Sequence, residues 1–164
     1  MLSLFGGAMT LVFPDENNLV DVSNLRQVPD HQEVFAHKTT NLSLIVEILD
    51  GVDKKECQDA LVYHFADVSD INEAKVQVTD KRTVNVDDIE HVADAAILSA
   101  SQAAAKFNEK QAENATVLMA LLRVPSKTAD VLITLNNPPS DTTLEKFEAT
   151  IKTFKIADMS IFAD

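Results

Sequence analysis

Two carboxylates, Glu47 and Asp50, are the residues best spaced to act together, and they lie in the segment TNLSLIVEILDG. Four apolar residues of this segment, together with Val52 directly after it, fall within one arc at 100° per residue, namely Leu44, Ile45, Ile48, Leu49 and Val52. That periodicity predicts a short helix, on which residues three apart share a face. The pair then has two interpretations: a solvated helix face, or a contact for Lys or Arg of a partner, made by charge-assisted hydrogen bonds.

Residues that could catalyse a reaction or hold a metal are sparse. The sequence contains no motif for phosphate, dinucleotide, zinc or calcium binding, and no nucleophile elbow. The four histidines, at positions 31, 37, 64 and 91, lack the spacing of metal ligands. Cys57 falls on the apolar side of an expected helix, which indicates a small buried hydrophobe rather than a nucleophile. His64 with a nearby serine is the remaining candidate for hydrolysis, since such pairs meet in space rather than in sequence. We therefore expect a protein that is not an enzyme and has no cofactor or metal site.

The charge of the chain is acidic and uneven. Among its 164 residues, 26 are Asp or Glu and 14 are Lys or Arg, which gives a net charge of −12. Residues 1–74 carry −9 of this charge and residues 75–164 carry −3. Such a surface repels nucleic acid and anionic membranes and attracts a basic partner, although acidic residues can also serve solubility alone.

The length and the composition fit one soluble unit. A chain of this size is expected to fold as one domain, residues 1–164. Its single cysteine rules out an internal disulfide and fits a reducing compartment. The segment MLSLFGGAMTLVF lacks a basic region and is broken by Gly6-Gly7, so no signal peptide is predicted. The chain has no run of 18 apolar residues, and we expect a cytosolic or nuclear protein with no membrane span.

The first half of the chain combines expected strands with the helix described above. AMTLVF (8–13) and QEVFAHK (32–38) have the alternation typical of strands. A second helix is expected directly after Gly51, because Asp53 and Glu56 are spaced as in a capping box and Cys57 and Leu61 continue at helical spacing.

The second half begins with predicted strands. KVQVTDKRTVNV (75–86) alternates and is rich in β-branched residues, so it predicts a strand or hairpin. Residues 93–107 are ambiguous, because their alanine content favours a helix while their surroundings favour a strand. Apolar segments at 115–124 and 128–137, separated by PSK, predict a hairpin.

The chain ends with a predicted amphipathic helix. Ser140 or Asp141 is expected to cap it, and its apolar stripe consists of Leu144, Phe147, Ile151 and Phe154. Strands grouped between helices favour the α+β class, with an antiparallel sheet and helices on its faces.

Three segments together resemble the Mog family, the Ran guanine nucleotide release factors. They are LFGGAMTLVFP (4–14), DVSNLRQVPDHQEVF (21–35) and SLIVEILD (43–50). The match continues more loosely through YHFADV (63–68), ALLRVPSKTADVLITLNNPP (120–139) and DMSIFA (158–163). It covers nearly the whole chain in the same order and with similar spacing.

The resemblance implies both a fold and a function. The fold is an α/β/α sandwich with a largely antiparallel central sheet flanked by helices, as in the PsbP-like proteins, and it makes 93–107 a strand. The function is binding to the small GTPase Ran and release of its guanine nucleotide in nucleocytoplasmic transport. The partner would be Ran, together with other Ran regulators, and not nucleic acid or membrane. The protein would act as a monomer in the nucleus and the cytoplasm.

The resemblance also implies a Ran-binding surface. Its members are the acidic pair and the signature block, namely Glu47, Asp50, Asp21, Asn24, Arg26, Pro29, Asp30, Gln32 and Glu33. Within that block, Leu25, Val28 and Val34 are expected to pack, and Arg26 can equally hold the loop in shape.

The sequence departs from the family at two places, and two other functions remain open. The link DENNL after Pro14 differs, so Asp15 and Glu16 are not carried over, and the loop after Asn137 is short, which puts a partner contact there in doubt.

One alternative is an acidic adaptor of the same fold that binds another basic partner without releasing nucleotide. The other is an esterase-like enzyme.

Overall fold

Seven antiparallel strands form the central sheet of this computed structural model, which describes residues 1–25, 27–71, 75–104 and 113–162. In sheet order the strands are β3 (Leu19–Asp21), β4 (Gln32–His37), β5 (Ser43–Asp50), β9 (Ala129–Asn136), β8 (Glu113–Val124), β7 (Asp94–Ala104) and β6 (Lys75–Val84). Each neighbouring pair is antiparallel, and β6 carries one irregularity between Val78 and Asp80. The expected α+β class with a mostly antiparallel sheet is confirmed.

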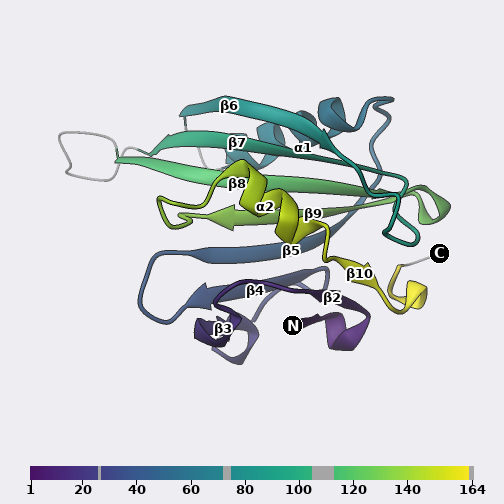
Figure 1. Ribbon diagram of the computed structural model, residues 1–164, viewed down its shortest axis with the longest axis horizontal. Helices are drawn as coiled ribbons and strands as arrows, with labels where there is room; N and C mark the ends of the chain where they lie inside the picture. The colour runs from purple at the N-terminus through teal and green to yellow at the C-terminus, as the bar shows by residue number, and fades with distance from the viewer. Residues whose placement is uncertain (26, 72–74, 105–112, 163–164) are drawn as a thin grey trace.

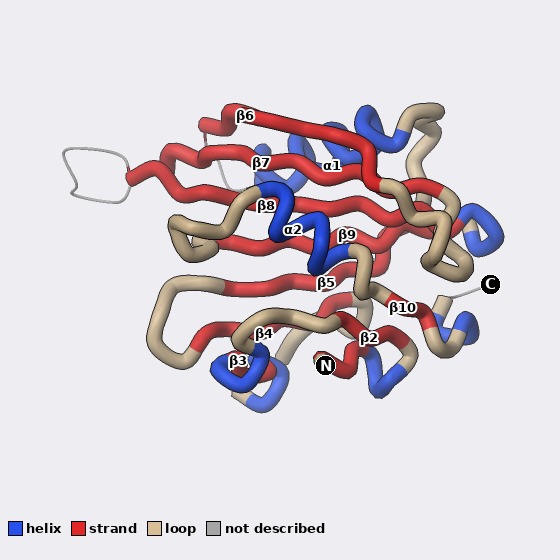
Figure 2. The backbone as a smooth tube through the Cα atoms, in the orientation of Figure 1, coloured by secondary structure: helices blue, strands red, loops and turns tan. Residues whose placement is uncertain are grey.

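One helix lies on each face of this sheet (Figures 1 and 2). Helix α1 (Cys57–Ile71) packs on one face and α2 (Leu144–Ile151) on the other. A small second sheet, in the order β1 (Leu2–Leu4), β2 (Met9–Leu11) and β10 (Lys155–Ile156), lies on the same side as α2. Because β8 and β9 have layers on both faces, their residues form nearly continuous apolar runs; seven of the eight β9 residues are buried.

Two apolar cores hold the layers together. The larger core joins the small sheet and α2 to one sheet face, through side chains such as Met9, Val46, Ile133, Phe147 and Phe154. The smaller core lies under α1. Its α1 side chains are Cys57, Ala60, Leu61 and Phe65.

The segment predicted as a short helix around Glu47 is a strand, β5, and that prediction was wrong. A short apolar run fits both periodicities, so its pattern alone does not distinguish them. Here hydrogen bonding to β4 on one side and β9 on the other decides the structure. Leu44 and Val46 face the larger core. Leu49, an odd number of residues away, packs toward the smaller core.

The other predicted elements are mostly confirmed. Residues 94–104 of the ambiguous segment are a strand, as the resemblance implied, while 105–107 lie outside the described residues. Residues 75–84 of the 75–86 segment are a single strand, and the 115–137 hairpin turns through a 3₁₀ helix, Pro125–Lys127. Helix α1 begins at Cys57, so Asp53 is too early to be its cap.

Helix α2 buries its predicted stripe, but its cap differs from the expected one. Thr143, not Ser140 or Asp141, accepts a hydrogen bond from the Lys146 backbone N–H at 3.2 Å. Phe154 lies beyond the end of the helix and is fully buried.

Candidate functional site

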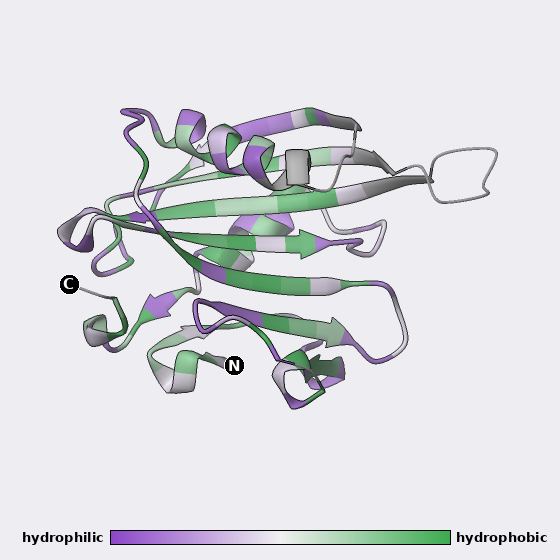
Figure 3. Cartoon of the chain, turned by 180° about the vertical axis from the view of Figure 1, so that it is seen from behind, coloured by the Kyte–Doolittle hydropathy of each residue, from purple (hydrophilic) through white to green (hydrophobic). Residues whose placement is uncertain are grey.

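Helix α1 covers only part of its sheet face. It packs on β6, β7 and β8, with Leu132 of β9 at the border of the smaller core. Seen from that side, β5 and β4 lie beside the helix and are not covered by it (Figure 3). We call the α1-side surface of β4 and β5 the open face. Directly paired residues of β4 and β5 point the same way, so this face carries Gln32, Val34 and Ala36 from β4 beside Ser43, Ile45 and Glu47 from β5.

Glu47 is the charged centre of the open face. Its direct partner across the strands is Gln32, whose side-chain Nε2 donates a hydrogen bond of 2.8 Å to Glu47 Oε2. The imidazole Nε2 of His31 lies 3.6 Å from the same oxygen. The Glu47 side chain is 16% exposed and that of His31 is 53% exposed. The carboxylate is therefore held in one orientation while its edge remains within reach of a cationic partner.

Asp50 does not share a face with Glu47, which corrects the predicted pairing. On a strand, residues three apart point to opposite faces. Asp50 is exposed at the end of β5 and lines a shallow hollow of about 300 Å³ together with Lys127, Phe162 and His31. His31 lies beside the Glu47 carboxylate and lines the same hollow as Asp50, and its backbone carbonyl accepts a 2.9 Å hydrogen bond from the Ile48 N–H. The two acids are thus neighbours around the end of the strand rather than along one face.

Several signature residues shape the loop that precedes β4. Asp21 caps the 3₁₀ helix Val22–Asn24 by accepting hydrogen bonds from the backbone N–H and the hydroxyl of Ser23, at 2.9 and 2.7 Å. The Pro29 carbonyl accepts from Gln32 N–H at 3.0 Å, which starts β4.

The remaining loop residues differ in exposure. Asn24, Pro29 and Asp30 are exposed, and Arg26 lies outside the described residues. Val34 is buried as expected, but Leu25 is 75% exposed, so the prediction that it packs was wrong. A large apolar side chain on a loop beside the open face is a candidate contact rather than a core residue.

Glu33 faces away from the open face. It is paired with Val46, whose side chain lies in the larger core. Its Oε1 accepts a 2.5 Å hydrogen bond from the backbone N–H of Phe5, a residue with φ of 52°. Burial raises the pKa of the Glu33 carboxyl, and the bond from Phe5 offsets part of that shift. Glu33 therefore ties the β1–β2 turn to the large sheet.

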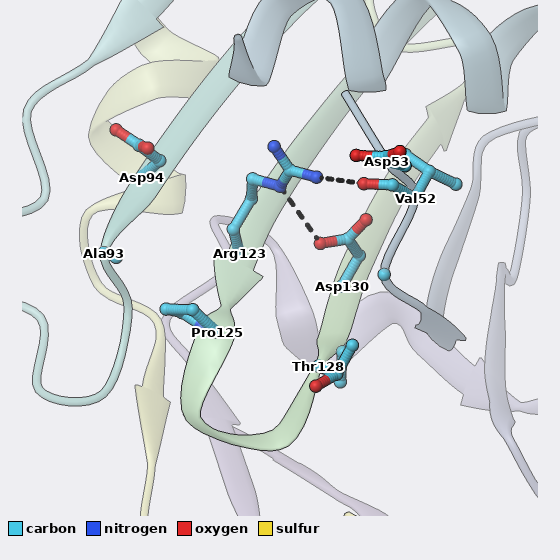
Figure 4. Close-up of a pocket in the computed structure, with 10 residues that line it drawn as sticks. Val52, Asp53, Ala93, Asp94, Arg123, Pro125, Thr128 and Asp130 are labelled. Carbon is cyan, nitrogen blue, oxygen red and sulfur yellow. Dashed lines mark hydrogen bonds and ion pairs between the residues drawn. The ribbon is translucent and has the colours of Figure 1, made fainter. Parts of the chain in front are cut away.

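A buried charged cluster under the start of α1 was not predicted from the sequence, and Figure 4 shows two of its members, Arg123 and Asp130. Asp130 accepts a hydrogen bond from Arg123 Nε at 3.4 Å through one oxygen, and its other oxygen lies 3.1 Å from His64 Nε2. The partner of His64 is thus Asp130 rather than the serine that a hydrolytic pair would need. Arg123 and Asp130 are directly paired across the β8–β9 hairpin, so the hairpin prediction itself contained the signal.

Metal-like and membrane-spanning features are not found in the described part of the chain. No three His, Cys, Asp or Glu side chains gather there in a way that could hold a metal ion. Neither described helix combines the length and the apolar character needed to cross a membrane. Burial raises the pKa of the Cys57 thiol to about 12, which opposes a nucleophilic role.

Comparison with known proteins gives consistent matches over the chain. The family described as Ran-interacting Mog1 protein matches residues 2–138. The Ran guanine nucleotide release factor of Danio rerio is 34% identical over 180 residues, covering 97% of each chain. The Bos taurus release factor is 43% identical over 145 residues, covering 84% of this chain and 75% of the other. The crystal structure of the Saccharomyces cerevisiae Ran-binding protein Mog1p superposes with a TM-score of 0.78 at 25% identity, covering 99% of this chain and 97% of the other.

Proposed function

The chain belongs to the family of Ran-interacting Mog1 proteins, and we propose that it binds the GTPase Ran and promotes release of Ran's guanine nucleotide. The family match is the observation that carries this proposal, and relatives named Ran guanine nucleotide release factor support it. Relatives named nuclear import protein support a role in nucleocytoplasmic transport. We further propose that it works as a monomer in the nucleus and the cytoplasm, alongside other Ran regulators.

Release of nucleotide requires no covalent chemistry, so the protein acts as a binding regulator rather than an enzyme. A release factor must bind the nucleotide-free or open GTPase more tightly than the nucleotide-bound form. By linkage, its binding then weakens nucleotide binding by the same factor. In GTPases the nucleotide is held by Mg²⁺, a phosphate-binding lysine and switch loops ordered by those contacts.

The open face supplies the contact in this proposal. Glu47, oriented by Gln32, pairs with a Lys or Arg of Ran. Asp50 provides a second carboxylate at the end of β5. The exposed side chains of Leu25, on the loop before β4, and Tyr63, on α1, provide apolar area. These contacts bias a switch segment of Ran away from its phosphate-holding state, and the exposed loop residues Asn24 and Asp30 adjoin them.

The test is release of a fluorescent nucleotide from Ran, measured over a range of protein concentrations. Glu47→Lys and Asp50→Lys should each raise the half-maximal concentration about tenfold or more, because each places like charges against the basic partner. Glu90→Lys is the matched control, since Glu90 is an exposed acid in the β6–β7 connection, at the other edge of the sheet. Circular dichroism and melting temperature confirm folding. Unchanged release by both acidic-site variants would reject the assigned contact.

A second candidate function is an acidic adaptor of the same fold. The uneven charge of −12 supports it, since that charge would attract basic partners other than Ran. Capture of a different basic protein through Glu47, with no effect of the wild-type protein on nucleotide release, would favour the adaptor.

A further inference from the structure

We propose that Arg123, Asp130 and His64 form a positioning latch that fixes the 51–56 connection between β5 and α1, and thereby holds the Ran contact in its binding geometry. The inference rests on the proposed function, because the strand entering this connection carries Glu47 and Asp50. The helix that leaves it borders the open face (Figure 3). The latch residues do not touch the partner, so their role is positioning.

The guanidinium of Arg123 reaches three acceptors at once, and Figure 4 shows two of these contacts, to Val52 and to Asp130. Its Nη2 donates to the carbonyl of Val52 at 2.7 Å and its Nη1 to the carbonyl of Lys54 at 2.5 Å. Its Nε donates to Asp130 at 3.4 Å. Two backbone carbonyls of the connection are thereby tied to the β8–β9 hairpin by charge-assisted bonds.

Asp130 and His64 keep the guanidinium in place. The Asp130 side chain is 2% exposed, and its second oxygen is occupied by His64 Nε2 at 3.1 Å. His64 belongs to α1, so the chain of contacts runs from the hairpin to both ends of the connection. The cluster borders a hollow of about 420 Å³ that is also lined by Gly51 and Val52.

The connection has few other attachments. Val52 is partly buried against the smaller core, while residues 53–56 are exposed. Gly51 N–H donates to the Thr128 carbonyl at 2.9 Å, and a Cβ at Gly51 would lie 3.2 Å from that oxygen. Lys54 Nζ also lies 5.6 Å from the centroid of the Tyr63 ring. With so little apolar area to bury, the hydrogen bonds from Arg123 are the main ties from this segment to the β8–β9 hairpin beyond Gly51.

The chemistry of the cluster fits a latch better than it fits a packing unit. Well-packed apolar residues can replace a buried ion pair with little loss of stability. They cannot bond two backbone carbonyls. A lysine would keep the charge beside Asp130 but lacks the planar fork that spans Val52 and Lys54. Replacing Arg123 and Asp130 by apolar residues should therefore free the connection while it changes the free energy of unfolding little.

Cys57 is a natural reporter of this segment. It is the single cysteine of the chain and the first residue of α1, directly after the connection. The side chain is 6% exposed, and its Sγ lies 3.9 Å from the Leu121 carbonyl. A thiol reagent therefore reacts with Cys57 when the start of α1 opens, and its rate measures that opening.

The experiment compares the double variant Arg123→Met/Asp130→Leu with the control Arg82→Met/Glu145→Leu, which removes a partly exposed ion pair between β6 and α2. Labelling of Cys57 by excess thiol reagent, well below the melting temperature, should be at least about tenfold faster in the latch variant than in the wild type or the control. The half-maximal concentration for nucleotide release from Ran should rise by a similar factor. Arg123→Lys, which keeps the charge, should not restore either value, whereas a purely electrostatic role would be rescued.

Each outcome decides the proposal. Wild-type labelling and wild-type release in a folded latch variant would overturn it, and so would fast labelling with unchanged release. If the double variant does not fold, Arg123→Lys carries the test, and wild-type values in that variant overturn the latch. If wild-type protein releases no nucleotide from Ran, the proposed function fails and the positioning role with it. Labelling of Cys57 in the isolated protein then still decides whether the cluster restrains the connection.

Discussion

At the scale of single residues, the predicted Ran-binding residues fall into two groups, those on the surface and those that hold the fold. Glu47 and Gln32 lie together on the open face. Asp21 caps a turn, and Glu33 joins two sheets on the other side of β4. The signature block is thus partly a binding surface and partly the scaffold that shapes it. A substitution in the block tests Ran binding only where the side chain is not already engaged in the fold.

Glu33 provides a prediction about pH. Because burial raises the pKa of its carboxyl in the folded state, the protonated form is favoured by folding. Its stabilising contribution is complete below the ordinary glutamate pKa of about 4.3 and is lost as pH rises through the raised folded value. Glu33→Gln keeps an oxygen for the Phe5 N–H and removes this titration. We therefore expect the variant to gain stability relative to wild type as the pH rises above the ordinary glutamate pKa, by less than about 1 kcal/mol.

Denaturant unfolding of both proteins at several pH values measures this difference. Glu33→Leu is the comparison, because it leaves the Phe5 N–H without its acceptor and should cost about 1–3 kcal/mol at every pH. A Gln variant that loses stability as strongly as the Leu variant would show that the charge of Glu33, rather than its oxygen, stabilises the turn.

At the scale of elements, the sequence predicts a helix that buries one face correctly, but it does not identify a strand whose residues are apolar on both faces. Helix α2 lies on the surface, so its stripe of Leu144, Phe147 and Ile151 stands out against polar neighbours. Strand β5 lies between paired strands, and its apolar run fits a helix equally well. The alanines of β7 are small because helices pack on both of its faces; Ala95 faces the larger core and Ala96 the smaller one.

The same limit applies to the candidate site. Gln32 and Glu47 are 15 residues apart and meet only through the β4–β5 register. Because the segment around Glu47 was predicted as a helix, this strand pairing could not be predicted. The pairing of Arg123 with Asp130 follows from the hairpin that the sequence does predict. Contact with Val52 and Lys54 could not be foreseen, because it depends on the path of the connection over the sheet.

Helix α2 offers a prediction at this scale. Thr143→Ala removes the oxygen that accepts from the Lys146 N–H and should lower the free energy of unfolding by about 1 kcal/mol. Ser140→Ala, the alternative cap suggested by the sequence, should change it by less than about 0.5 kcal/mol, because Ser140 is exposed outside the helix. Equal losses in the two variants, measured by denaturant unfolding, would contradict the observed cap.

At the scale of the whole molecule, charge and architecture coincide. The half of the chain that carries −9, residues 1–74, supplies β3, β4, β5 and α1. These are the elements that form and border the open face (Figure 3). Part of this acidic charge, including Glu47 on the open face and Asp50 at the end of β5, lies on these elements, which favours encounter with a basic surface from that side.

That arrangement predicts how salt affects binding to Ran. The screening length falls from about 10 Å at 0.1 M ionic strength to about 3 Å at 1 M. The association rate constant should therefore fall steeply with added salt while the dissociation rate constant changes little, because steering acts on encounter rather than on contacts already formed. Stopped-flow measurements at several salt concentrations give both constants.

Glu47→Lys should flatten the salt dependence more than the control Glu90→Lys, since Glu47 lies on the open face and Glu90 in the β6–β7 connection at the other edge of the sheet. An association rate constant independent of salt would mean that the acidic half of the chain serves solubility alone and that the contact with Ran is made by apolar side chains such as Leu25.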